Sequence, residues 1–121
     1  MGTYRMYADA NDDTTWEPVD LEAHKDWLDG FEATHVRFGI RPPGVVQDWH
    51  PAPQRQLVIV LSGRLQITYP DGSRKVFGPG DARLMDNITG KGHRTMALGS
   101  EPCVTATVVL TDQTPRRGPI G

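Results

Sequence analysis

Short segments rich in branched and aromatic side chains recur along the chain, and Gly, Pro or Asp separates each one from the next. This spacing, without an intervening helical pattern, is typical of an antiparallel sandwich or barrel rather than a parallel α/β sheet. Between two of the segments, Asp71-Gly72 supplies the positive φ values that a tight hairpin requires. The predicted strands are 34–40, 57–63, 64–70, 74–78, 81–86, 93–98 and 103–110.

Only one segment has a helical pattern. Asp20 is a suitable helix cap, Leu21 and Leu28 lie on a common helical face, and Gly30 is suited to end the helix. The fold class predicted from the pattern is therefore all-β, with at most one short helix.

The length of the chain favours one domain. It has 121 residues and a mass of 13.4 kDa, which leaves little room for a second core. We expect a single domain over 1–121 with its core at about 34–110. Residues 111–121 combine Pro, Gly and charge, and they are expected to form a flexible C-terminal tail.

The charge of the chain and the length of its apolar runs indicate which binding partners and which cellular location to expect. The formal net charge is -2 and the isoelectric point is near 6.0, which disfavours binding to nucleic acid or to an anionic membrane. No apolar run has the length of a membrane span or the character of a signal peptide, so a soluble, cytoplasmic protein is expected. Cys103 is the only cysteine and opens an apolar run, which favours a buried structural thiol over a nucleophile.

Two stretches, 44–63 and 78–97, contain Gly and His at defined spacings, at Gly44, His50, Gln56, Gly63, Gly80, Asp81, Gly90 and His93. These positions resemble the two sequence motifs of the cupin superfamily. The residues of the two stretches are similar to those of small bacterial single-domain cupins. The resemblance implies a cupin-type double-stranded β-helix, which is a jelly-roll barrel. Ala52 stands where the family has a second His, and Gln56 replaces a Glu. The metal motif is therefore degenerate.

The spacing of the polar residues predicts a site inside the barrel. Positions 50, 52 and 56 share parity, so in an extended strand they point to one face, and closure of the barrel brings His93 opposite them. The resemblance implies a metal cage at His50, Gln56 and His93, with one divalent ion (Zn, Fe, Mn or Ni) as the expected cofactor. A carboxamide oxygen is a weaker ligand than a carboxylate, which predicts lowered metal affinity.

Three functions remain open at this point. The favoured one is an enzyme that acts on a small organic molecule in the barrel by non-redox proton transfer, with His50, His93 and Gln56 as catalytic residues. Isomerisation, elimination and cyclisation belong to this class. The alternatives are a metal-dependent oxygenase and a non-catalytic binding or sensing module.

Residues near the predicted barrel mouth are candidates for substrate binding. Trp49 could stack on a ligand, whereas Asp86 and Arg94 bracket the loop before His93 and could bind a polar or anionic group. His35 and Arg37 alternate with an apolar set formed by Val36, Phe38 and Ile40. If the apolar set faces the barrel, His35 and Arg37 point outward.

The segment Tyr4 to Tyr7 alternates polar and apolar residues, which predicts a strand. Its edge is expected to be free to pair with a second copy of the chain. A homodimer is therefore expected, with a small-molecule substrate as the other partner.

Overall fold

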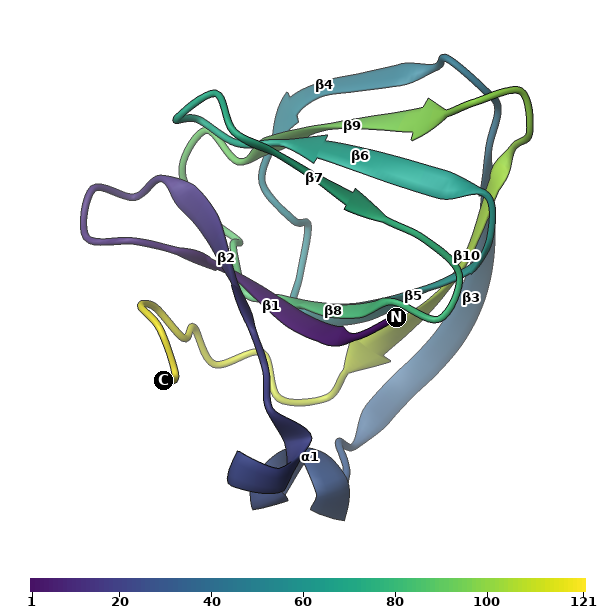
Figure 1. Ribbon diagram of the computed structural model, residues 1–121. Helices are drawn as coiled ribbons and strands as arrows, with labels where there is room; N and C mark the ends of the chain where they lie inside the picture. The colour runs from purple at the N-terminus through teal and green to yellow at the C-terminus, as the bar shows by residue number, and fades with distance from the viewer.

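Ten strands form two sheets that face each other in the computed structural model, which describes residues 1–121 (Figure 1). The larger sheet has the order β2-β1-β8-β5-β10-β3, and the smaller has the order β4-β9-β6-β7. No helix is both long and apolar enough to cross a membrane. The strands are β1 (Thr3–Ala8), β2 (Thr14–Pro18), β3 (Ala33–Arg41), β4 (Val46–His50), β5 (Gln56–Ser62), β6 (Arg64–Thr68), β7 (Arg74–Phe77), β8 (Ala82–Met85), β9 (His93–Leu98) and β10 (Cys103–Leu110).

Every strand predicted from the residue pattern is present, and the fold is the expected all-β barrel. The predicted hairpin joins β6 to β7 in antiparallel register. Its turn is closed by the Tyr69 N–H, which donates to the Ser73 carbonyl at 2.9 Å. Gly72 adopts a φ of 86° there, a conformation that a side chain would disfavour.

The strand expected at Tyr4 to Tyr7 is present as β1, whereas β2 and β4 are absent from the list of predicted strands. Each is short and contains polar or charged residues, so its strand conformation depends on pairing rather than on intrinsic propensity. The N-terminal strand β1 pairs with β2 on one side and with β8 on the other. The expectation that Tyr4 to Tyr7 is free for a second copy is therefore wrong, because both edges of that strand are occupied.

The predicted helix is present as two short pieces below the larger sheet (Figure 1). A 3₁₀ turn, η1, covers Leu21–Ala23, and α1 covers Lys25–Asp29. The Asp20 carboxylate caps the first turn by accepting from the Glu22 N–H at 3.1 Å, and Gly30 ends α1. None of the residues in these pieces is buried, so the helical segment does not contribute to the core.

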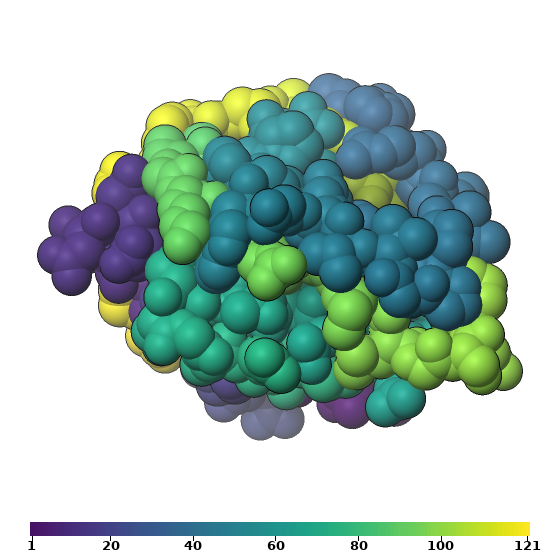
Figure 2. All heavy atoms as spheres, turned by 90° about the horizontal axis from the view of Figure 1, so that it is seen from above, coloured from purple at the N-terminus to yellow at the C-terminus, as the bar shows by residue number.

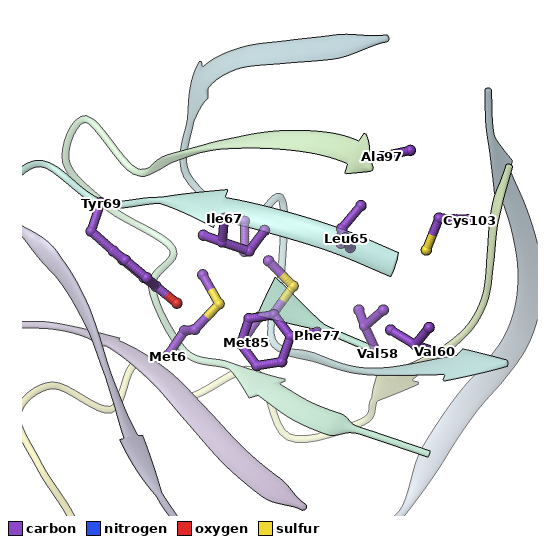
Figure 3. Packing of buried hydrophobic residues seen from close by; sticks show 11 residues of the cluster. Met6, Val58, Val60, Leu65, Ile67, Tyr69, Phe77, Met85, Ala97 and Cys103 are labelled. Atoms are coloured by element: carbon purple, nitrogen blue, oxygen red, sulfur yellow. The ribbon is translucent and has the colours of Figure 1, made fainter. Parts of the chain in front are cut away.

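Apolar side chains from both sheets point toward one another in the space between them (Figure 3). The most deeply buried are Met6, Ile67 and Phe77, each with no exposed surface. Alternation along each strand explains this arrangement, because every second residue faces the opposite sheet. The complete cluster is Met6, Ala52, Val58, Val60, Leu65, Ile67, Tyr69, Phe77, Met85, Ala97 and Cys103.

Residues 111–121 form no strand or helix, yet they lie against the outer face of the larger sheet. The guanidinium of Arg5 donates to the carbonyl oxygens of Gly118 at 2.6 Å and of Arg116 at 3.1 Å. The Gly118 N–H in turn donates to the Ala8 carbonyl. The expected C-terminal tail is almost entirely exposed, and these hydrogen bonds attach it to β1.

The edge strand β3 has the opposite orientation to the one expected. Val36, Phe38 and Ile40 are exposed, with 73% of Phe38 accessible to solvent, whereas Arg37 points between the sheets. Register with β10 decides this orientation, because residues paired across two strands share a face. His35 shares parity with Arg37, but it is exposed.

Candidate functional site

A cavity of about 370 Å³ lies between the two sheets, next to the apolar core. Its nineteen lining residues come from β3, β4, β5, β6, β8, β9 and β10 and from the segments beside β4. Seen from above, β4 and the residues leading into it lie across this end of the molecule (Figure 2). Lining residues on β3 and β4 are exposed, so the cavity opens to solvent on that side.

His50 ends β4 and lines the cavity. The register of β4 against β9 shifts between Gln47 and His50, so that Gln47 pairs with Thr95 and His50 pairs with His93. This extra residue is a β-bulge, which turns His50 toward the cavity although it and Gln47 differ in parity. His50 Nδ1 lies 2.7 Å from the Asp48 carbonyl oxygen. Because a carbonyl only accepts, Nδ1 is the donor and Nε2 of His50 is left as a proton acceptor.

His93 opens β9 directly opposite His50, and the centroids of the two rings are 4.5 Å apart. Gly92 makes this approach possible, because a Cβ at that position would collide with the His50 carbonyl. Gly92 also adopts a φ of 81°, which favours glycine over other residues. The glycine before His93 therefore sets the spacing of the histidine pair.

Burial and hydrogen bonding define the protonation state of His93. Only 1% of the residue is exposed, and its Nδ1 lies 2.9 Å from the amide nitrogen of Asn87. In this amide orientation Asn87 donates, so Nδ1 accepts and the ring proton is on Nε2. Desolvation by burial, with smaller contributions from His50, Arg83 and Arg41, lowers the pKa of His93 to about 3. His93 is therefore neutral at pH 7 and presents an N–H.

Gln56 is the first residue of β5 and also lines the cavity. Its Oε1 accepts weakly from Arg37 Nη2 at 3.4 Å, and its Nε2 lies 3.7 Å from Met85 Sδ. Gln56 and His50 both line the cavity, but not because they share parity on one extended strand. Residues 51–55 form no strand, so no single extended segment carries 50 and 56, and each points inward from its own strand.

The lining residues do not suit a divalent cation. No group of three His, Cys, Asp or Glu side chains is placed to hold an ion. The Nε2 of His93 carries a proton in the tautomer above, and Gln56 offers a neutral oxygen already directed at Arg37. The cavity wall also carries three arginines and no acidic residue. His50, Gln56 and His93 thus line one cavity, but the positive charge of its three arginines disfavours a bound cation.

The three predicted substrate-binding residues do not line the cavity. Trp49 lies under Lys91, whose Nζ is 4.0 Å from the ring centroid, and Arg94 forms an ion pair with Asp48 at 3.1 Å. Arg94 follows His93 directly, so alternation along β9 places the two side chains on opposite faces. Asp86 is buried on the other face of the larger sheet, where it pairs with Arg5.

Sequence reasoning missed the arginines of the cavity. Arg37, Arg41 and Arg83 line it, and Cys103 forms part of the same wall. Burial raises the pKa of the Cys103 thiol, so this cysteine stays protonated at neutral pH. Arg83 could have been found from alternation, since it shares parity with the apolar Met85 on β8 and should therefore face inward.

No protein-family model and no curated protein matches the sequence. Among solved structures, the polyketide cyclase RemF from Streptomyces resistomycificus superposes with a TM-score of 0.54 at 20% identity, over 93% of this chain and 74% of that chain. A protein of unknown function from Rhizobium leguminosarum gives a TM-score of 0.50 at 27% identity, over 64% of this chain and 69% of that chain.

A Cupin 2 conserved barrel domain protein from Salinispora arenicola gives a TM-score of 0.49 at 23% identity. This match covers 60% of the present chain and 59% of the Salinispora protein, which is less than two thirds of its length. Two facing sheets, with β1 parallel to β8 and the other pairs antiparallel, agree with the double-stranded β-helix that the motifs at 44–63 and 78–97 imply. The chain has the cupin fold.

Proposed function

We propose that this protein is an enzyme that moves a proton within a small organic molecule held in the cavity, without oxidation or reduction. The observation that carries the proposal is the pairing of His50 with His93 at a centroid separation of 4.5 Å, with complementary free ring atoms. One ring offers an acceptor and the other offers a donor, which is the arrangement that general acid–base chemistry requires. Isomerisation, elimination and cyclisation are the reaction classes that it suits.

The two histidines would have different roles. Nε2 of His50 would take a proton from a substrate carbon and return it to another position, so that the proton count is unchanged over the cycle. The Nε2–H of His93 would donate a hydrogen bond to the oxygen on which negative charge develops. Because His93 is neutral at pH 7, it would act as a hydrogen-bond donor rather than as a cation. Gln56 would orient a carbonyl or hydroxyl group beside them.

The fold is compatible with this class of activity. RemF, which is a polyketide cyclase by name, shares the fold at 20% identity, so the comparison supports the architecture rather than the substrate. The cavity of about 370 Å³ is within the size range of small-molecule sites.

Hydrogen–deuterium exchange at carbon tests the proposal without knowledge of the natural substrate. The probes are phenylpyruvate and phenylacetone in D₂O, both of which carry a C–H beside a carbonyl, and proton NMR follows the loss of that signal. We expect the protein to accelerate exchange of at least one probe, and His50→Gln to slow the accelerated rate by roughly 10²–10⁴-fold. His35→Gln, which changes an exposed histidine outside the cavity, should leave the rate unchanged. No acceleration, or equal rates for the protein and H50Q, would contradict the proposal.

We propose separately that the protein is a homodimer, which cannot form through β1 because that strand is paired on both sides. Exposed apolar side chains on the edge strand β3 make association of two copies compatible with the fold. Light scattering at micromolar concentration should give about twice 13.4 kDa, and a mass equal to one chain would reject the dimer.

A further inference from the structure

Arg83 is a buried cation that has no partner within the protein. Only 5% of the residue is exposed, and its Nε and Nη1 atoms are buried without any hydrogen-bond partner. Register with β5 places Arg83 opposite Val58 and on the same face, so that both line the cavity. The guanidinium therefore lies in the cavity wall with unsatisfied donors.

The other buried arginines of the chain each form an ion pair with an acidic side chain, which makes Arg83 an exception. Arg5 binds the carboxylates of Asp86 and Glu17 at 2.7 and 2.9 Å, and Arg55 binds Asp86 as well. An unpaired charge in a protein interior lowers the stability of the fold. At Arg5 and Arg55 the acidic partners prevent this loss. A counter-ion for Arg83 must come from outside the chain.

The guanidinium keeps its charge at neutral pH despite this environment. Desolvation by burial lowers the pKa of Arg83 to about 10, which is still well above 7. The centroid of the Phe77 ring lies 5.1 Å from Cζ of Arg83. An aromatic face offers a cation partial compensation but does not accept its N–H groups as an anion does.

The rest of the cavity supports an anionic occupant. Arg41 and Arg37 add two further positive charges toward the exposed side, and Gln47 orients Arg41 through a hydrogen bond of 2.7 Å. No Asp or Glu lines the cavity, although the whole chain carries a net charge of -2. Positive charge is thus concentrated at the cavity, although the net charge of the whole chain is negative.

We propose that the cavity binds a small organic oxyanion, a carboxylate or a phosphate, with Arg83 as its buried counter-ion. The part of the guanidinium that faces the cavity would donate to the oxygens of the ligand, and guanidinium groups form such charge-assisted hydrogen bonds with both kinds of anion. Arg41 and Arg37 would attract the ligand at the open side, and Val58, Leu65 and Met85 would contact its apolar body. The inference deepens the proposed function, since it names the substrate class of the same cavity.

The side-chain Nε–H signal of Arg83 in a nitrogen-15 NMR spectrum gives a direct test. The signal is assigned as the one that is missing from the spectrum of the Arg83→Met variant. The probes are acetate, inorganic phosphate and acetamide, each titrated to tens of millimolar at pH 7 and constant ionic strength. We expect a saturable shift of this signal with acetate, with phosphate or with both, and none with the neutral acetamide. The stronger of the two anions identifies the ligand as a carboxylate or a phosphate. If neither anion shifts the signal, or if acetamide shifts it equally, the proposal is wrong.

Calorimetry measures the contribution of Arg83 to the binding affinity. The ligand is the anion that shifts the signal, or its phenyl derivative, which is phenylacetate for acetate and phenyl phosphate for phosphate. Arg83→Met should weaken binding about 30-fold or more, because it removes one partner of a buried charge pair. Arg94→Met removes an arginine that lies outside the cavity, and it should change the affinity less than about twofold. R83M should itself fold, since the change removes a buried unpaired charge. Equal affinities for the wild-type protein and R83M would overturn the proposal.

These measurements need no turnover, so they separate the two proposals. Loss of carbon exchange in H50Q together with unaltered anion binding by R83M would reject only the oxyanion ligand. Anion binding that depends on Arg83, without any carbon exchange by the wild-type protein, would reject only the enzyme and would indicate a binding protein for organic anions.

Discussion

Replacement of Asp86 with alanine is expected to lower the free energy of unfolding by about 3–5 kcal/mol, measured by urea denaturation at pH 7. Asp86 is 3% exposed, and its two carboxylate oxygens bind the Nε atoms of Arg5 and Arg55. Removal of the carboxylate would leave both buried guanidinium groups without their shared counter-ion. Arg5 would keep Glu17 at 2.9 Å, but Arg55 would keep only the Asp112 carboxylate at 3.9 Å, and the other remaining acceptors are uncharged carbonyl oxygens of the C-terminal tail.

Two further variants show whether the loss comes from the charge. Asp86→Asn keeps the size of the side chain and should lose nearly as much stability, because an amide does not neutralise two cations. Asp29→Ala removes the acidic partner of an exposed ion pair with Lys25 and should have almost no effect. A loss below about 1 kcal/mol for D86A would mean that Asp86 does not hold the two arginines together.

Lowering the pH from 7 to 5 is expected to cost about 2 kcal/mol of stability through His93 alone. An unfolded chain binds a proton at this residue below about pH 6.5, whereas the folded protein does not until its pKa of about 3. The unfolded state therefore gains protons first, and the free energy of unfolding falls as the pH drops from 6.5 toward 3. Desolvation of the buried ring, assisted by His50, Arg83 and Arg41, is the cause of the lowered pKa.

The variant His93→Gln isolates this contribution, since it removes the titrating ring and keeps a polar side chain. Urea denaturation of both proteins at pH 7 and pH 5 gives the effect as a difference of differences, in which the other titrating groups cancel. H93Q should be less stable at pH 7 but should lose about 2 kcal/mol less than the wild-type protein on acidification. Identical pH dependence in the two proteins would show that His93 titrates normally in the folded state.

The histidine pair was predictable because each residue belongs to a motif that resembles one of the cupin superfamily. The resemblance implies that His50, at the end of β4, and His93, at the start of β9, face each other. Gly92 belongs to the same local pattern, and its close approach to the His50 carbonyl gives a physical reason for a glycine there. The predicted partner Gln56 also reached the cavity, although through a separate strand.

The substrate-binding residues were not predictable in the same way. Trp49 and Arg94 are neighbours of His50 and His93 in sequence, but in a strand adjacent residues face opposite sides. Nearness along the chain was therefore a poor guide to nearness in the cavity. Asp86 faces away from the cavity, where Arg5 and Arg55 approach it from distant parts of the chain.

The fold class, most strands and the 69–73 hairpin follow from the sequence alone, because alternation and turn chemistry are local properties, and the resemblance of two motifs implied the histidine pair. Tertiary structure alone decided which face of β3 points inward, since register with β10 outweighed the apolar character of Val36, Phe38 and Ile40. It also decided that the tail is held by Arg5 and that Arg83 is buried without a partner. Pairing and burial of charges depend on residues far apart in the chain, so no local pattern could reveal them.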